Sequence, residues 1–252
     1  ETADHAKRLV TTSPVLSYRK LNSILNNPYF ESAEINLYFK DNSNLQAELK
    51  KLQDEVVSKV KKGASIIHLI EDLPKQGNLP INALLAVGSV HQRLVKLGLR
   101  SDANIIVTTS SARDTHQIAC LIGFGATAVY PTLAYQTILD LTDRNELKGD
   151  AHENCSRYRK GINKGLLKII SKMGISTISS YRGSQLFEIV GLDKDVVNLC
   201  FTNTESRIKG KKFKDLDLEL KSLNEYARSN IADIKVGGLL KYIHGGEYHT
   251  YN

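Results

Sequence analysis

The chain has 252 residues, of which 41% are hydrophobic, and a formal net charge of +7 at pH 7. This length and composition suffice for one large or two small domains with a buried core. No apolar run reaches the roughly 18 residues that a membrane-spanning helix needs, and the polar start from Glu1 to Arg8 excludes a signal peptide there. We therefore expect a soluble, cytoplasmic protein. Because the first residue is Glu1 and the single methionine is Met173, we also expect a segment of a longer polypeptide.

The first regular pattern in the chain is an amphipathic helix. Apolar residues recur at helical spacing from Leu45 to Val60, Ser43 and Gln46 form a candidate capping box, and Gly63 can end the helix. The following run, 65–70, is short, apolar and β-branched, which predicts a strand buried on both faces.

The same alternation continues in the next part of the chain. The apolar stretch 81–97 predicts a well-buried helix, and 105–107 predicts a second strand. A further helix is expected over 112–122, capped by Ser110 or Ser111.

Five more elements are predicted beyond it. Strands are expected at 127–129 and 175–178, and helices at 155–173, 184–190 and 216–227. Strands separated by helices of this length need crossover connections, which indicates a mostly parallel sheet. The predicted fold class is α/β, built of parallel βα units, with an incomplete or degenerate barrel as one form of it.

The two ends differ from this α/β pattern. Residues 1–43 carry prolines and asparagines with little periodicity, so we expect an N-terminal arm packed over another surface. Residues 44–210 would form the core, and 211–252 a helix and a glycine-punctuated tail. We expect the whole chain, 1–252, to act as one domain.

The sequence contains no clear metal or redox motif. Cys120, Cys155 and Cys200 stand too far apart for paired metal ligands or a dense disulfide framework, and we expect reduced, buried thiols. The tail from His244 to His249 has two imidazoles and a carboxylate, but it lacks the HExxH order. We predict no catalytic, cofactor-binding or metal residue in this chain.

Two hydroxyl-rich loops, 108–113 and 179–184, follow predicted strands. Helix starts at such places present unpaired N–H groups that can bind an anion. The alternative is that the serines cap helices and the arginines pair with nearby carboxylates. The candidate anion-facing or tunnel-lining residues are Thr108, Thr109, Arg113, Thr177, Ser179 and Arg182.

The histidines and a lysine cluster are two further candidates for functional residues. His91 and His116 lie on neighbouring predicted helices and would form a reactive pair only if the fold brought them together; buried structural histidines are the simpler interpretation. The basic cluster, Lys209 to Lys214, suits a solvated loop more than a nucleic-acid site.

Several blocks of the sequence resemble one known family. The most specific is KGLLKIISKMGISTISSYRGSQLFEIVGL, from Lys164 to Leu192, and collinear matches include 79–88, 123–126 and 245–249. In these blocks the chain resembles the central domain of the large subunit of glutamate synthase. It departs from the family at several polar positions, for example Gln117, where the family has a histidine; this disfavours a catalytic role.

The resemblance implies a function for the longer polypeptide. Members of the family hydrolyse glutamine in one domain, pass ammonia through a tunnel, and make glutamate from 2-oxoglutarate in a domain with FMN and an iron-sulfur cluster. This chain would be the structural linker between the amidotransferase and FMN-binding domains, with no cofactor of its own, and would wall part of the tunnel. It would expose apolar surface and could self-associate, while no membrane or nucleic-acid partner is expected.

Two other functions remain as alternatives. One is an autonomous α/β enzyme that acts on a phosphorylated substrate through His91, His116 and the hydroxyl-rich loops. The other is a basic nucleic-acid-binding module that uses the lysine cluster. Whether the isolated chain is an enzyme stays open, and so does the electron donor of the longer polypeptide.

Overall fold

The computed structural model of the protein describes residues 7–71, 77–229, 237–238 and 242–246. Its main sheet has four parallel strands in the order β1-β3-β5-β6. These strands are β1 (Ser32–Asn36), β3 (Ile66–Glu71), β5 (Asn104–Thr109) and β6 (Ala128–Pro131). Helices connect them in turn, namely α2 (Leu45–Lys61), α3 (Ala83–Lys96) and α4 (Thr115–Gly123). The sheet is therefore open in the described part of the chain, with β1 and β6 at its edges.

The two faces of the sheet pack against different partners because side chains alternate along each strand. Ile67, Leu69, Ile105 and Val107 belong to the main core with α2, α3 and α4. Ile66, Ile106 and Ala128 point to the opposite face, where α1 (Tyr18–Leu25) covers them with Leu21 and Ile24.

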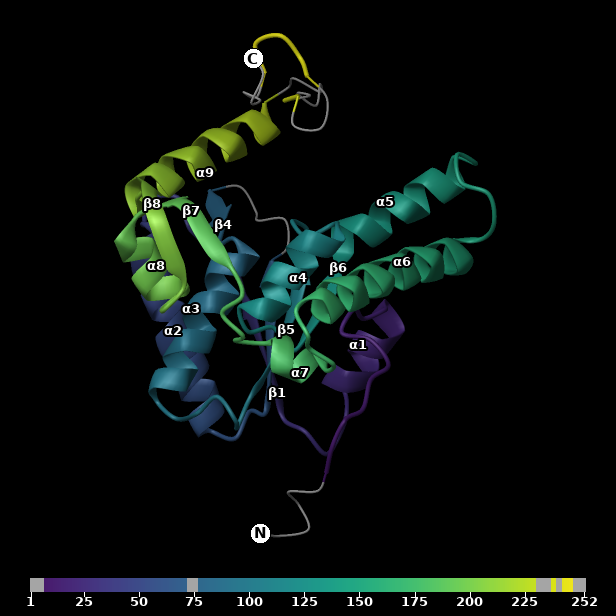
Figure 1. The fold of residues 1–252 in the computed structure, drawn as a ribbon, viewed down its shortest axis with the longest axis horizontal. Helices are drawn as coiled ribbons and strands as arrows, with labels where there is room; N and C mark the ends of the chain where they lie inside the picture. The colour runs from purple at the N-terminus through teal and green to yellow at the C-terminus, as the bar shows by residue number, and fades with distance from the viewer. Residues whose placement is uncertain (1–6, 72–76, 230–236, 239–241, 247–252) are drawn as a thin grey trace.

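The remaining elements flank this sheet. A long helical pair, α5 (Thr132–Asp143) and α6 (Ala151–Lys172), extends from one side of the molecule (Figure 1). A second parallel unit consists of β7 (Glu188–Leu192), α8 (Lys194–Cys200) and β8 (Glu205–Lys211), and α9 (Phe213–Arg228) follows it. The short elements are the antiparallel pair β2 (Tyr38–Lys40) and β4 (Asn78–Pro80), and the one-turn helix α7 (Ile178–Tyr181).

The predicted α/β class and its parallel sheet are confirmed. The strands expected at 65–70, 105–107 and 127–129 are β3, β5 and β6. The helices expected at 45–63, 81–97, 155–173 and 216–227 are α2, α3, α6 and α9. These segments have long or strongly periodic patterns, which are the most reliable signals in a sequence.

Two predictions after α6 are wrong. The strand expected at 175–178 is absent, because the Thr177 hydroxyl accepts a hydrogen bond from Ser180 N and starts α7 instead. The helix expected at 184–190 is replaced by β7, which pairs with β8. The Gly183 and Gln185 backbones have φ of 71° and 56°, which interrupts a helix, and strand pairing then decides the conformation.

Two boundaries also differ from expectation. The irregular N-terminal arm contains α1 and β1, and β1 is a full strand of the main sheet. Helix α4 begins three residues later than predicted, because Asp114 and Gln117 form a reciprocal capping box that the serines do not provide.

Candidate functional site

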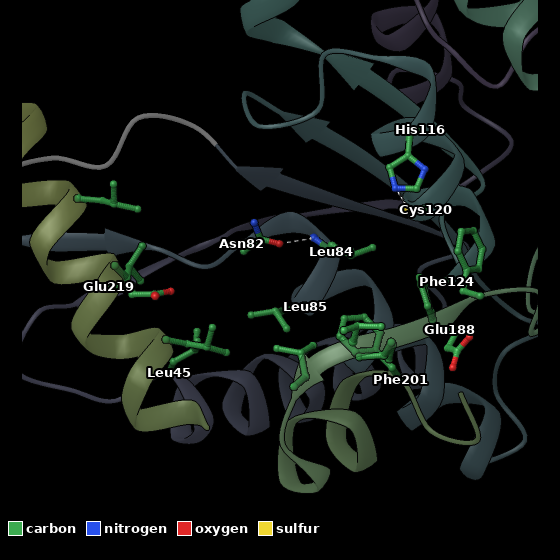
Figure 2. Close-up of a pocket in the computed structure, with 17 residues that line it drawn as sticks. Leu45, Asn82, Leu84, Leu85, His116, Cys120, Phe124, Glu188, Phe201 and Glu219 are labelled. Carbon is green, nitrogen blue, oxygen red and sulfur yellow. Dashed lines mark hydrogen bonds between the residues drawn. The ribbon is translucent and has the colours of Figure 1, made fainter. Parts of the chain in front are cut away.

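An open, mostly apolar groove of about 500 Å³ lies between α9, the start of α3, α4 and β7, as shown in Figure 2. We call it the apolar groove. Its apolar lining consists of Leu45, Leu84, Leu85, Phe124, Phe187, Ile189, Val190, Leu192, Phe201, Leu216, Leu220 and Leu223. The polar residues that line it are Asn82, His116, Cys120, Glu188 and Glu219. The groove is therefore a surface that favours apolar contact.

Polar side chains of the groove either have hydrogen-bond partners within the chain or are unreactive. Asn82 accepts a hydrogen bond from Leu84 N at 3.0 Å and caps α3. Cys120 Sγ lies 3.6 Å from His116 Nε2, one turn away on α4. Burial and, secondarily, the charge of Asp114 raise the pKa of Cys120 to about 11, so the thiol is protonated at neutral pH. The Cys120–His116 pair consequently lacks an activated nucleophile.

Exposed apolar side chains continue from the groove along β7 and onto β8. Val190 and Ile208 are opposite each other in the register of the two strands and are 67% and 60% exposed. On α9, Leu223 lines the groove and is 66% exposed. Adjacent apolar side chains at this exposure are typical of a surface that a partner covers.

The carboxyl edge of the main sheet is filled by a buried carboxylate, that of Glu71. One oxygen, Oε1, accepts a hydrogen bond from Ala83 N at 3.0 Å. The other, Oε2, accepts from the Thr109 hydroxyl, from Ser111 Oγ at 2.8 Å and from Ser111 N at 3.3 Å. The hydroxyls of the first predicted anion loop thus serve an internal anion. Of that loop's other candidates, Arg113 is exposed and its N–H donates to Gln117 Oε1.

Thr108 lies on the opposite face of the sheet and bonds to a histidine. Its Oγ1 is 2.7 Å from Nε2 of buried His68, and His68 Nδ1 is 3.2 Å from Glu34 Oε1. Burial lowers the pKa of His68, while Glu34 opposes that shift. Glu34 and His68 are register partners on β1 and β3, and Thr108 lies two residues beyond Ile106, the partner of His68 on β5. These contacts therefore link three strands through their side chains.

The second predicted anion loop separates into two parts. Thr177 caps α7 and its hydroxyl lies 3.2 Å from Ser179 Oγ. Arg182 follows α7, is partly buried, and donates from Nη1 to Thr127 Oγ1 at 3.1 Å. Ser179 and Arg182 line the same cavity, which the other four candidates do not.

His91 and His116 have separate environments. Arg100 donates from Nε to His91 Nδ1 at 2.9 Å, and His91 is buried on α3. His116 lines the apolar groove, whereas His91 lines a smaller cavity beside Gly183 and Thr204. The two histidines therefore do not act on a common substrate position.

The cysteines are free thiols, and only Cys200 is fully buried; Cys120 and Cys155 are half-buried, contrary to expectation. Among the described residues, no group of three or more histidine, cysteine or acidic side chains is placed to hold a metal ion. Of the tail motif from His244 to His249, Glu247, Tyr248 and His249 lie outside the described residues. The part of the chain that the structure describes contains no helix with the length and apolarity to cross a bilayer.

The basic cluster is not the solvated loop that we expected. Lys209 and Lys211 are on β8, and Lys212 and Lys214 lie at the start of α9. Lys211 is paired with Glu219. The cluster is exposed, but its positive charge is partly neutralised by its own chain.

Sequence reasoning missed Glu71 and Arg100. Glu71 is the last residue of β3, whose other residues are apolar apart from His68, and its strand partner is Thr109 of the hydroxyl-rich loop. Arg100, which follows α3, bonds to His91 and donates to the carbonyl groups of Ala103 and Gly125. The acid at the strand end was a readable signal, but the position of Arg100 is visible only in three dimensions.

The fold and the site together define an α/β domain with an open sheet and a large apolar groove. The carboxyl edge of its sheet is filled by the hydrogen-bonded Glu71 side chain. The family model described as "Glutamate synthase central domain" matches residues 1–193. The chain therefore belongs to the glutamate synthase central domain family.

Curated relatives support this assignment along the whole chain. The sequence is 33% identical to the large chain of the NADPH glutamate synthase of Bacillus subtilis, covering 98% of this chain and 16% of that protein. It is 34% identical to ferredoxin-dependent glutamate synthase 1 of Arabidopsis thaliana, covering 99% of this chain and 16% of the relative. The NADH glutamate synthase of Schizosaccharomyces pombe is 32% identical, over 97% and 12% of the two chains. The chain thus spans 16% of the length of each of the first two relatives.

Solved structures add only a distant similarity. A double mutant of flavocytochrome b2 with sulfite bound superposes with a TM-score of 0.43 and 11% identity, covering 73% of this chain and 43% of that one. At that TM-score the likeness carries no functional argument.

Proposed function

We propose that this chain is the inter-domain scaffold of a glutamate synthase. In this proposal it lies between a glutamine-hydrolysing amidotransferase domain and an FMN-binding domain of the same cytoplasmic polypeptide. The whole enzyme would make glutamate from glutamine and 2-oxoglutarate. The chain would hold the two reaction centres at a fixed separation and form part of the wall of the ammonia path.

The observation that carries the proposal is the exposed apolar surface formed by the groove and the Val190–Ile208 pair. An isolated domain leaves such a surface in water at a cost of roughly 25 cal/mol per Å² of apolar area, so a neighbour that covers it gains that free energy. The chain spans only 16% of the Bacillus and Arabidopsis relatives, which leaves ample protein to supply the neighbour. Helix α9 forms one wall, so we assign the groove to the FMN-binding domain that would follow it.

The chemistry of ammonia explains why such a scaffold would form the wall of a path between the two reaction centres. Free ammonia is protonated in neutral water and then loses its nucleophilic lone pair, so a dry path between the two centres preserves it. Of the residues proposed for that path, Thr108 and Thr109 are buried on the sheet, whereas Ser179 is at the surface. The apolar groove would exclude water at the contact between domains.

The cofactors that the family implies do not fit this chain. The three cysteines lie on different helices, α4, α6 and α8, with Cys200 buried, whereas an iron-sulfur cluster needs clustered cysteine ligands. The carboxyl edge of the main sheet, where a flavin phosphate would be expected in an α/β protein, is occupied by Glu71 and its hydrogen bonds. FMN and the iron-sulfur cluster are therefore assigned to other parts of the polypeptide.

The test uses the longer polypeptide that contains this chain. Val190→Asp places a charge in the proposed contact, and we expect glutamine hydrolysis, which itself releases one glutamate, to continue while the formation of glutamate from 2-oxoglutarate falls at least tenfold. Ammonia released to solvent would rise by the amount of 2-oxoglutarate-derived glutamate that is lost. Leu167→Asp is the matched control, because Leu167 is 59% exposed on α6 and does not line the groove.

A second measurement addresses the surface itself. Hydrogen exchange of α9 and β7 should be slower in the longer polypeptide than in the 252-residue chain. Equal exchange in both, together with equal effects of the Val190 and Leu167 variants on glutamate formation, would rule out the proposed contact. The isolated chain should also self-associate, and Val190→Asp should reduce that association in sedimentation experiments.

A further inference from the structure

We propose that a second cavity, at the amino edge of the main sheet, binds a small organic carboxylate with a compact apolar body. We call it the Arg182 cavity. It has a volume of about 490 Å³, within the usual range for small-molecule sites. Its described lining residues are Lys7, Arg8, Leu9, Thr11, Ile24, Phe30, Ile66, Asn104, Ile106, Thr127, Ala128, Ser179 and Arg182.

The cavity combines an apolar floor with a basic rim. Ile66, Ile106 and Ala128 are buried residues of the sheet face that α1 covers, and Ile24 and Phe30 come from the same cluster. Three lining residues, Lys7, Arg8 and Arg182, are cationic, and no aspartate or glutamate occurs among the described residues that line the cavity. The floor suits a hydrocarbon body and the rim an anionic group, so the cavity is matched to a molecule with both.

Arg182 is the anchor because it is fixed in place yet lacks a compensating charge. Its Nη1 donates to Thr127 Oγ1 at 3.1 Å. Thr127 Oγ1 is itself held by Ile105 N at 3.2 Å and lies 3.4 Å from Asn104 Oδ1. Within the described part of the chain Arg182 forms no ion pair, although it is only partly exposed. A guanidinium has five N–H donors in a planar fork that fits a carboxylate, so most of its donors remain for a ligand.

The charge behind the cavity strengthens this argument. Arg100 donates to His91 and to two carbonyl groups, none of which is negatively charged. Burial lowers the pKa of Arg100 to about 10, and the charge of Arg182 adds to that shift. Two arginines that repel each other without a carboxylate between them are costly when half-buried, and an oxyanion at Arg182 would relieve that cost.

The position separates this cavity from the apolar groove. Ile66 and Asn104 begin β3 and β5, so the cavity lies at the amino edge of the sheet, whereas the groove adjoins the starts of α3 and α4 beyond the carboxyl edge. Binding at Arg182 is therefore independent of the domain contact proposed for the groove.

The experiment titrates the 252-residue chain with three probes, followed by chemical-shift changes in NMR. Benzoate combines a carboxylate with an apolar ring, inorganic phosphate has charge without the ring, and benzyl alcohol has the ring without charge. We expect saturable benzoate binding with shifts at residues of β5, β6 and α7. Phosphate and benzyl alcohol should each bind at least tenfold more weakly, and benzoate binding should weaken as salt is raised.

Variants separate a specific site from general charge. Arg182→Gln should weaken benzoate binding at least tenfold, and Arg182→Lys should restore part of it, because lysine keeps the charge but loses the fork. Arg113→Gln, which removes an exposed arginine outside the cavity, should leave it unchanged. The amide spectrum of each variant shows whether the fold is preserved.

Three outcomes would overturn the proposal. These are equal effects of Arg182→Gln and Arg113→Gln, phosphate binding as tight as benzoate binding, and loss of benzoate binding in the longer polypeptide. The last result would mean that a carboxylate of a neighbouring domain occupies Arg182. Persistence of binding there supports a small-molecule site.

Discussion

Arg100 Nε lies 2.9 Å from Nδ1 of His91, and because arginine can only donate, His91 must accept at Nδ1. The imidazole is therefore neutral, with its proton on Nε2. Burial lowers the pKa of His91 to about 4, and the charges of Arg100 and Arg182 act in the same direction. The histidine is a structural acceptor for a buried arginine.

This relationship predicts a loss of stability in mild acid. The pKa of His91 is lower in the folded protein than the ordinary 6.5, so protonation favours the unfolded chain. The stability that neutral His91 contributes to the fold is fully present above pH 6.5 and is lost as pH falls toward 4. The loss between pH 7 and 5 is about 2 kcal/mol. His91→Asn keeps an acceptor but does not titrate.

Urea unfolding of both proteins at pH 7 and 5 measures this effect. The pH-dependent loss should be smaller in His91→Asn by about 2 kcal/mol. The same loss in both proteins would show that other groups, and not His91, account for the acid sensitivity.

The contact between α3 and α8 predicts an unusual response to Gly88→Ala. A Cβ at Gly88 would overlap the carbonyl oxygen of Cys200 and lie 3.0 Å from Phe201 Cε1. Glycine to alanine in a helix normally stabilises by about 1 kcal/mol, but overpacking costs about 1–3 kcal/mol. We expect a net loss of stability.

Gly161→Ala is the matched control. Gly161 is inside α6, and a Cβ there meets nothing within 4 Å. Thermal unfolding should show that this variant gains up to about 1 kcal/mol. A similar gain for Gly88→Ala would contradict the close packing of α3 on α8.

The hydrogen bonds of Glu71 predict a strong effect of Glu71→Gln. Four donors point at this carboxylate, and a glutamine would present two N–H donors to some of them. We expect a loss of about 2–4 kcal/mol in urea unfolding. Glu55→Gln, at an exposed position of α2, should change stability by less than about 0.5 kcal/mol. Similar losses for both variants would argue against a structural role of the hydrogen bonds to Glu71.

The cysteines should differ in reactivity with iodoacetamide. Cys200 is fully buried and burial raises its pKa to about 12, so it should react only in the unfolded chain. Cys155 and Cys120 are half-buried, and the pKa of Cys120 is about 11, so both should react slowly at pH 8. Mass spectrometry of the modified peptides against time gives the order, and early modification of Cys200 would contradict its buried position.

The sequence predicted the parts of the fold whose pattern is local and long. The helices over 45–63 and 155–173 have a repeating apolar face, and 65–70 is apolar enough to be a strand in any neighbourhood. The segment 184–190 was misread because β7 exists only through its pairing with β8. β1 was missed for the same reason, since Ser32–Asn36 has a mixed composition and its pairing with β3 decides its conformation.

The candidate site was predictable only in part. The hydroxyl-rich loop singled out Ser179 and Arg182 as anion-facing candidates on the ground of a helix N-terminus, and that role stays a prediction; the structure shows that both residues line the Arg182 cavity. Thr109 and Ser111 read as anion binders, and the anion proved to be the chain's own Glu71. A loop sequence shows which donors are available, whereas their acceptor comes from another strand.

Family membership and the α/β class were thus determined by the sequence alone, because collinear motifs and periodic apolar residues are properties of order along the chain. The apolar groove, the closed carboxyl edge and the Arg182 cavity were decided only by tertiary structure. Each depends on side chains from distant segments, and burial and charge compensation are set by which atoms meet in space.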